Sequence, residues 1–353
     1  MTLLYGFQSL KDLVNARVTE VGVNVVNVAI TQSVTEHNRQ MAALMALLAK
    51  PITDFKVTYK TPTAARLAAL DEFGRARPIK TVGKYDVSFP IQSAGVAWGT
   101  TRIAREKMTV QEANEATAAL ISADIRWMRD HTLAALFANA SWTFTDEEHG
   151  SLTIKGPANG DTDTYLQING TDIGTTDDHF KAQAGAIADG ANPFAADRDD
   201  LMEHPENGGE AVALVASDLV SSISGLTNFI PVSDPNVQLG SGSKWLTGNL
   251  GVALPGKVIG YVDKVWISEW KGLPSTYYAM ISTQGEAPLA MRQHPEASLQ
   301  GFNRVAERND HPFVESQWER HAGFGAWNRV GAVVRKIGAG AYAIPTNYTS
   351  PMP

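Results

Sequence analysis

The sequence predicts an α+β fold, and three observations support that class. Residues 55–60 and 84–89 alternate apolar and polar side chains, as half-buried strands do. Residues 109–139 contain neither Gly nor Pro and are rich in alanine, which favours one continuous helix. Residues 211–289 mix short apolar strands with small helices. With 353 residues, 44% of them apolar, the chain has material for one large core or a few smaller ones.

Composition excludes several functional classes. The net charge of −7 argues against a general nucleic-acid-binding surface, which needs dense Lys and Arg to displace counterions. The absence of cysteine excludes disulfides, thiolate zinc sites and cysteine nucleophiles. The longest apolar run, 41–49, is far shorter than the roughly 20 residues of a membrane span, so we expect a soluble, intracellular product without a membrane partner. The low charged fraction of 19% indicates that other chains cover part of its surface.

The first 34 residues lack a clean helical period, although they contain apolar stretches such as 21–30. We therefore predict an extended arm. Ser33 and Glu36 have the spacing of a capping box, and Pro51 stops any helix that begins there. The sequence thus predicts an arm followed by one short amphipathic helix over residues 1–50.

The two alternating stretches predict a long hairpin with its return over residues 51–108. About 20 residues connect the strands, which is too long for a tight turn. Residues 54–86 hold seven Lys or Arg and four acids, a local excess of +3 on an acidic chain. A two-stranded ribbon is marginal alone in water, so we expect it to lie against another subunit. The charged residues expected to take part in assembly are Lys56, Lys60, Arg66, Asp71, Glu72, Arg75, Arg77, Lys80 and Lys84.

The predicted helix over 109–139 would be about 45 Å long, longer than most single domains require. A stripe of large apolar side chains marks the face expected to pack. Its members are Leu120, Ile121, Ile125, Trp127, Met128 and Leu136.

Residues 145–210 differ in charge from the rest of the chain. They hold fifteen acids and three basic residues, a net −12. Their Gly, Asn and Thr content predicts an exposed, insertion-like region with a helix over 177–188 and an irregular loop over 192–209.

The remaining elements are short. Strands are predicted at 211–217, 258–268 and 277–283, with a small helix at 218–225. The last part predicts closing strands at 312–324, 326–336 and 338–345, the first two separated by a turn at 323–325.

No motif predicts catalysis, a cofactor or a metal. Residues 251–257 have the Gly and Lys spacing of a phosphate-binding loop, but Val258 replaces the required Ser or Thr, so we expect a plain turn. The eight histidines form no HExxH motif, and the pairs 148–149 and 178–179 would point in opposite directions if extended. Asp197, Asp199 and Asp200 lack the EF-hand order and predict a solvated acidic loop. No G-x-S-x-G elbow is present, and we expect no enzyme activity.

In the order of its elements the chain resembles the tailed-bacteriophage major capsid protein of the Hong Kong ninety-seven type. The residues that carry the resemblance are the hairpin over 54–91, the helix that follows it, and the ending over 323–334. The resemblance implies an extended N-terminal arm, a long hairpin called the E-loop, a spine helix in a peripheral (P) domain, and an α+β middle (A) domain. The implied borders are 1–50 for the arm and short helix, 51–108 for the E-loop and return, 109–165 for the P domain, 166–289 for the A domain, and 290–353 for the P-domain closing strands and C-terminus.

The resemblance also implies a function in assembly. The chain would form hexamers and pentamers of itself in an icosahedral shell around phage double-stranded DNA, which it would contact weakly and without sequence specificity. It would be part of the virion, assembled in the host cytoplasm with a separate scaffolding protein and a portal. Some relatives link a hairpin lysine to a P-domain asparagine; in this chain the candidate types are Lys56, Lys60, Lys80 or Lys84 with Asn328, and no motif fixes the pair.

Two other functions stay open. An encapsulin-like nanocompartment shares the fold but would hold a cargo enzyme instead of DNA. A soluble carbohydrate-active or metal-dependent hydrolase could use the clustered acids and the tryptophans, and it would remain a small oligomer with a cleft.

Overall fold

The chain forms two compact units, each built from segments that are distant in sequence. The computed structural model describes residues 6–60, 67, 69–76, 84–168, 176–231, 254–308 and 313–352. Unit 1 comprises Met1–Met45, Ile91–Asp130 and Arg292–Gly323, and unit 2 comprises Ala46–Pro90, His131–Met291 and Phe324–Pro353.

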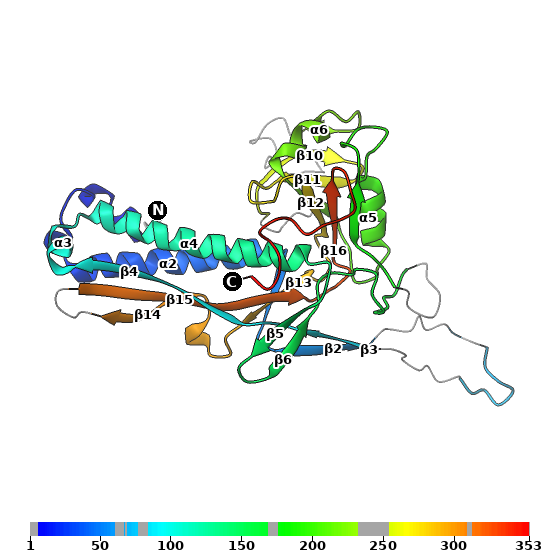
Figure 1. Cartoon of the computed structure of the whole chain (residues 1–353), viewed down its shortest axis with the longest axis horizontal. Coiled ribbons are helices and arrows are strands. Elements are labelled where there is room, and N and C mark those ends of the chain that lie inside the picture. Colours follow the sequence, from blue (N-terminus) through cyan, green and yellow to red (C-terminus); the bar gives the residue numbers. More distant parts are fainter. Residues whose placement is uncertain are drawn as a thin grey trace. The chain divides into compact units, whose positions relative to one another are not determined.

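Unit 1 packs two long helices over strands. Helix α2 (Val23–Met45) and the first part of α4 (Val110–Phe137) lie side by side along strands β4 (Gln92–Thr101) and β15 (Phe313–Ala326) (Figure 1). Strand β4 pairs antiparallel with β15, which also pairs with β14 (Phe302–Arg308). The core joins buried side chains of all these elements, including Val26, Ile30, Val34, Val110, Leu120, Phe302 and Trp318.

The predicted arm is wrong, because residues 6–45 are mostly helical. A 3-10 helix, η1 (Gly6–Leu13), and a short α1 (Val18–Val21) precede the 23-residue α2. The β-branched residues of 21–30 suggested extended chain, but tertiary packing overrides that weak propensity. The buried side chains of α2 recur every three or four residues, namely Val26, Ala29, Ile30, Val34, His37, Met41 and Met45.

The predicted long helix is confirmed as α4. Its start is fixed by a capping box, in which the Glu112 N–H donates to Thr109 Oγ1 at 3.2 Å and the Thr109 N–H donates to Glu112 Oε2 at 2.8 Å. The helix continues from unit 1 into unit 2 between Asp130 and His131. Strand β15 likewise passes from one unit to the other, at Gly323 and Phe324.

Unit 2 is built on a seven-stranded mixed sheet in the order β7-β16-β12-β8-β11-β10-β9. Helix α5 (Phe194–Met202) contacts β12, β16 and β11 of that sheet. The sheet and its helices bury a shared apolar core that includes Phe194, Leu201, Ile223, Ile267, Tyr278 and Val333. The strands are β7 (Phe180–Gln183), β8 (Ala211–Val215), β9 (Ile230–Pro231), β10 (Lys257–Val262), β11 (Val265–Glu269), β12 (Tyr277–Ser282) and β16 (Ala332–Ile337).

Two predictions for the acidic region are wrong. The segment predicted as a helix over 177–188 contains strand β7, because the Asp178 side chain accepts a hydrogen bond from the Phe180 N–H and turns the chain. The segment predicted as a loop over 192–209 contains α5. The buried face of α5 carries Asp197 as well as Phe194 and Leu201. Because a charged residue occupies one of the buried positions, the apolar residues do not show a clear helical period.

The turn predicted at 323–325 is also wrong, because these residues lie inside β15. A Cβ on Gly325 would stand 2.9 Å from the Ser88 carbonyl oxygen, so the glycine permits a close approach of two backbones. The stretch 338–345 forms no strand. The phosphate-loop spacing leads into strand β10 at Lys257 and not into a helix, as expected for a plain turn.

Smaller elements complete the described chain, and no described helix combines the length and apolar character that a membrane span requires. Two hairpins stand apart from the large sheets, one formed by β2 (Lys56–Lys60) with β3 (Lys84–Ser88) and one by β5 (Trp142–Asp146) with β6 (Gly150–Ile154). The others are β1 (Ala49–Ile52), α3 (Arg102–Lys107), η2 (Ser217–Leu219), α6 (Val220–Ser224), β13 (Leu289–Gln293) and η3 (Ala297–Leu299).

Candidate functional site

The β2–β3 hairpin has one face attached to its own unit. Tyr59 stacks on Tyr85 with ring centroids 5.3 Å apart, and Trp327 meets Tyr59 edge-on. Val57 and Val87 join the same apolar cluster. The strands predicted at 55–60 and 84–89 are therefore confirmed, and their apolar face packs within unit 2.

On the polar face of the hairpin, side chains of β2 contact a side chain of β3. Lys56 Nζ lies 2.7 Å from Asp86 Oδ2, and Thr58 Oγ1 donates to Asp86 Oδ1 at 2.6 Å. Both charged side chains are about two-fifths exposed, at 41% and 42%, so this pair contributes little to stability. Lys56 already has an acidic partner in its own subunit.

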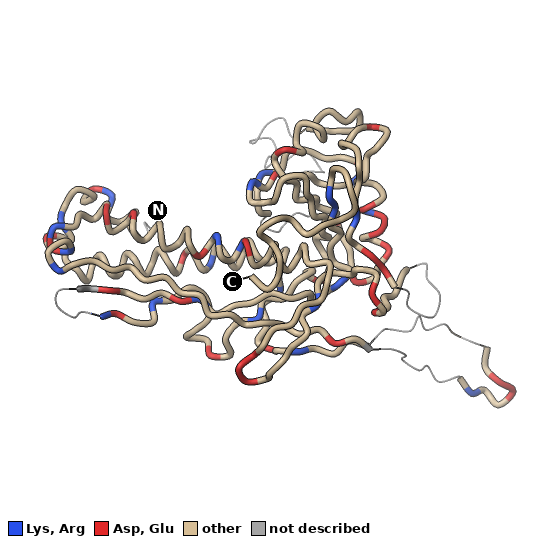
Figure 2. The backbone as a smooth tube through the Cα atoms, in the orientation of Figure 1, with Lys and Arg blue, Asp and Glu red and all other residues tan. Residues whose placement is uncertain are grey.

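The described part of the hairpin tip is a compact turn. Asp71 Oδ1 accepts hydrogen bonds from the N–H groups of Phe73, at 2.9 Å, and Arg75, at 2.8 Å. The guanidinium of Arg75 lies over the Phe73 ring, 5.5 Å from its centroid. Asp71 thus shapes the turn, and Arg75 flanks an aromatic ring. Acidic and basic residues both lie on this described turn (Figure 2).

This turn exposes large apolar side chains that sequence reasoning missed. Phe73 is 73% exposed and Leu70 is 61% exposed, and Leu67 is fully exposed. They recur every three residues, but the described residues of this segment form no helix or strand, so only their exposure in the structure marks them. An apolar group of this size at the end of a ribbon is typical of a surface that another chain covers.

The other predicted hairpin residues are placed less fully. Glu72 is exposed in the turn. Lys60 and Lys84 are the paired ends of β2 and β3. Arg66, Arg77 and Lys80 lie outside the described residues. Their part in assembly stays a prediction.

The side chains predicted to pack along α4 differ in burial. Leu120, Met128 and Leu136 are buried, and Ile121 and Trp127 are partly buried. Ile125 is 42% exposed and lies outside the buried face. The buried position next to it is taken by Asp124.

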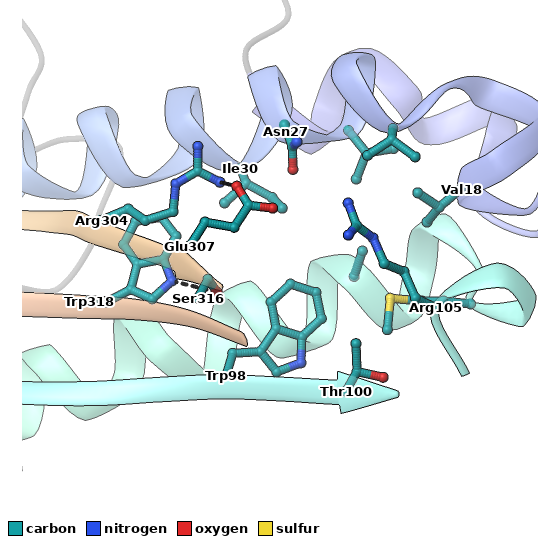
Figure 3. A pocket seen from close by; sticks show the side chains of 14 residues that line it. Val18, Asn27, Ile30, Trp98, Thr100, Arg105, Arg304, Glu307, Ser316 and Trp318 are labelled. Carbon is teal, nitrogen blue, oxygen red and sulfur yellow. Dashed lines mark hydrogen bonds and ion pairs between the residues drawn. The ribbon is translucent and has the colours of Figure 1, made fainter. Parts of the chain in front are cut away.

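Unit 1 holds a small aromatic pocket between α2 and the strands (Figure 3). Its cavity of about 50 Å³ is lined by Ile30, Trp98 and Trp318, among others. Arg105 projects toward this space from α3, and Arg304 and Glu307 form an ion pair at its rim, 3.3 Å apart. A volume of this size is enough for a few water molecules.

Unit 2 holds a wider pocket at the base of the hairpin. Its volume is about 430 Å³, and its lining includes Tyr59, Tyr85 and Tyr165. The hydroxyl groups of Tyr59 and Tyr165 are buried and have no hydrogen-bond partner in the described part of the chain. Burial raises the pKa of both phenols, so they stay neutral donors facing this pocket.

Asn328, the candidate for a covalent link, lines the same pocket but is engaged within its own subunit. Its Nδ2 donates to Asn207 Oδ1 at 3.1 Å, and its Oδ1 accepts from the Val330 N–H at 3.3 Å. The residue is 9% exposed. These contacts give Asn328 a structural role in unit 2.

Several acids of 145–210 are paired with cations inside unit 2, and Asp197 is buried in α5, which corrects its interpretation as part of a solvated loop. Other acids of the segment, such as Glu148 and Asp189, are exposed. The guanidinium of Arg329, 1% exposed, pairs with Asp161 and Asp163. Arg335 pairs with Asp197, which is fully buried. Both cations come from outside the acidic region, so the net −12 of that segment overstates the charge it presents to solvent.

Two histidines that the sequence left unassigned meet one carboxylate. His179 and His204 are both fully buried, and the Nε2 atom of each faces Asp177 Oδ2. Twenty-five positions separate the two histidines in the chain, so no local motif predicts that both lie beside Asp177. The only local signal is the Asp-x-His spacing of residues 177–179.

Comparison with known proteins identifies the fold. No protein-family model matches the sequence, and no curated protein matches it either. A solved structure from Mycobacterium phage Patience is 20% identical, with a TM-score of 0.67, and the match covers 97% of this chain and 96% of that one. Two more distant matches are the bacteriophage PhiM1 mature capsid, at 9% identity, TM-score 0.49 and 84% and 87% coverage, and the capsid of a native GTA particle, at 14%, 0.46 and 84% and 91%.

The chain has the same fold as the Mycobacterium phage Patience protein. The predicted α+β class is therefore confirmed. At 20% identity the similarity establishes the fold and assigns no role to any residue.

Proposed function

We propose that this chain is the major capsid protein of a tailed bacteriophage. Copies of the chain assemble, as hexamers and pentamers, into an icosahedral shell that encloses double-stranded DNA. The role is structural and non-enzymatic, and the protein is a component of the virion. A separate scaffolding protein and a portal take part in assembly in the host cytoplasm. The phage-capsid fold supports this proposal.

The observation that carries the proposal is the apolar turn at the hairpin tip. Leu70 and Phe73 are exposed to water in the single chain. Exposing apolar surface to water costs free energy, and this cost is removed when a neighbouring subunit covers both side chains. Full burial of one such side chain is worth about 1.5–3 kcal/mol. In a closed symmetric shell every subunit makes the same contact, so a modest free energy per contact adds up to a large stabilisation of the whole shell.

Charge has a secondary role in this mechanism. Lys56 is paired within the hairpin, and Arg75 flanks Phe73. The remaining basic residues of the hairpin steer the encounter with an acidic neighbour, while apolar burial holds the contact. The net charge of −7 fits weak, sequence-independent contact with packaged DNA.

The test is particle formation by the purified protein, measured by light scattering and negative-stain imaging, with scaffold added if needed. We expect hollow shells from the natural chain. The double variant Leu70→Ser with Phe73→Ser should stay as small oligomers with an unchanged circular dichroism spectrum. Ile103→Ser, which removes a comparably exposed apolar side chain from α3 outside this turn, should assemble normally.

Normal shells from the double serine variant would show that the apolar tip is not needed for assembly. A natural chain that remains a monomer or dimer under all these conditions would contradict the shell itself and favour the hydrolase. Nuclease-protected DNA in particles made in the host would select a virus capsid, whereas an enclosed enzyme would select a nanocompartment.

A further inference from the structure

Asp177, His179 and His204 bring three metal-ligand atoms together inside unit 2. These atoms all lie within 4.8 Å of one another. The Nε2 atoms of His179 and His204 are 3.2 Å and 2.8 Å from Asp177 Oδ2. Among the described residues this is the one group of at least three His and acid side chains so arranged.

The second nitrogen of each imidazole is held by the backbone. His179 Nδ1 lies 2.9 Å from the Ala332 carbonyl oxygen, and His204 Nδ1 lies 2.9 Å from that of Leu166. A carbonyl oxygen can only accept, so each Nδ1 carries the proton. In the neutral rings the free lone pairs are therefore on Nε2, and both point at the same carboxylate oxygen.

Lone pairs do not stabilise one another, so either protons or a metal cation must lie between these atoms. Two buried imidazolium rings could supply the protons, but His179 and His204 are both fully buried and share one oxygen of Asp177. Burying two cations against one carboxylate oxygen is costly. One divalent cation satisfies both nitrogen lone pairs and the carboxylate with a single ion.

We propose that Asp177, His179 and His204 form a structural zinc site. Imidazole nitrogen and carboxylate oxygen are ordinary Zn²⁺ ligands, and an Nδ1–H held by a backbone carbonyl is the usual outer-shell support for a metal-bound histidine. Glu203 Oε1 is 3.8 Å from His204 Nε2 and accepts a hydrogen bond from Gln167 at 2.7 Å, so Glu203 would have to give up that contact to become the fourth ligand, a place that a water molecule could also take. The Asp177 side chain is 15% exposed, which gives the ion a route from solvent.

The site would connect elements that the chain otherwise joins only by packing. Asp177 and His179 immediately precede β7, at one edge of the seven-stranded sheet. Glu203 and His204 immediately follow α5, which packs on that sheet. A bound ion would therefore fix the end of α5 to the start of the edge strand and raise the stability of unit 2 by mass action.

The experiment is a metal titration of the full-length protein after treatment with EDTA. We expect one Zn²⁺ per chain by calorimetry, a higher melting temperature, and a tetrahedral visible spectrum when Co²⁺ replaces Zn²⁺. His179→Ala and His204→Ala should each weaken Zn²⁺ binding by more than about 100-fold, beyond the effect of losing an outer-shell partner. His149→Ala is the matched control, because His149 also lies beside a carboxylate, 3.8 Å from Glu148, but outside the group.

The outcomes separate the alternatives. Failure of the natural protein to take up Zn²⁺ or Co²⁺ overturns the proposal and leaves imidazolium–carboxylate pairs. Unchanged affinity in both histidine variants also overturns it. If those variants fail to fold, X-ray absorption of the Zn²⁺-loaded natural protein decides, since two imidazole ligands are expected and fewer would contradict the site. Shell formation is not part of the readout, so this test is independent of the proposed capsid function.

Discussion

Asp124 on α4 and Arg320 on β15 form a buried, two-pronged ion pair, although 196 positions separate them in the sequence. Arg320 donates to both carboxylate oxygens, with Nη2 2.7 Å from Oδ2. His37 of α2 approaches the same Oδ2 at 2.6 Å. The side chains of Asp124 and Arg320 are 2% and 6% exposed. A polar contact thus connects both long helices to the sheet of unit 1.

Replacing Asp124 by Asn should destabilise unit 1 strongly. The change leaves the Arg320 guanidinium buried without its counter-charge, and breaking such a pair costs about 3–5 kcal/mol. Urea unfolding of the purified subunit measures the loss. Asp130→Asn, one and a half turns further along α4 in a partly exposed pair with Arg129, should change the free energy of unfolding by no more than about 1 kcal/mol. Equal effects of the two variants would contradict this ranking.

The same pair predicts an acid-dependent loss of stability. Burial by itself raises the pKa of Asp124, but hydrogen bonds from His37 and Arg320 outweigh it and hold that pKa below its ordinary value. The unfolded chain therefore takes up this proton first as the pH falls. The stabilisation is fully present above the ordinary Asp pKa of about 3.9 and is lost as the pH falls from there through the lower folded value. The stability difference between the natural chain and Asp124→Asn should shrink below about pH 4. A constant difference down to the acid limit would contradict it.

Two contacts of α5 should differ in strength because they differ in burial. Arg335 Nε donates to Asp197 Oδ2 at 2.8 Å, and Asp197 is fully buried. Arg335→Met should lower the free energy of unfolding by about 3–5 kcal/mol. Lys181 pairs with Asp200 of the same helix, also at 2.8 Å, but these side chains are 30% and 39% exposed. Lys181→Met should cost about 0–1 kcal/mol. Chemical denaturation of both variants tests the order.

Gly156 should tolerate no side chain. A Cβ there would stand 2.0 Å from the Ala138 carbonyl oxygen, which is backbone and cannot rotate away. Gly156→Ala should therefore destabilise unit 2 by about 1–3 kcal/mol. Gly185, where a Cβ would meet nothing within 4 Å, provides the control. Gly185→Ala should leave the melting temperature unchanged or raise it slightly.

Strict periodicity made part of the fold predictable. Alternation placed β2 and β3, and the uninterrupted helical composition placed α4. Periodicity failed where a polar or β-branched residue occupied a core-facing position. Asp197 interrupts the apolar face of α5, and the Val-rich start of α2 resembles a strand until packing selects the helix. Strand β4 was not predicted. Small residues such as Gly95 and Gly99 stand between Val96, Trp98 and Thr100, so apolar and polar side chains do not alternate clearly along this strand.

The candidate sites were less predictable than the fold. The charges of the hairpin drew attention to its tip, but the exposed Leu70 and Phe73 belong to a turn, where no period separates buried from exposed residues. His179 and His204 converge only because α5 packs on the sheet. Arg329 and Arg335, which neutralise the acidic segment, lie more than a hundred residues beyond its centre, so counting charge by segment could not reveal them.

The internal position of β16, next to the edge strand of the sheet of unit 2, has a consequence for synthesis. This strand comes last among the strands in sequence, yet it lies between β7 and β12 and pairs with both. Until residues 332–337 have left the ribosome, β7 and β12 present open edges to each other and to neighbouring nascent chains. The sheet of unit 2 is therefore complete only after β16 has been synthesised, and a chain truncated before this strand would carry exposed strand edges that favour aggregation.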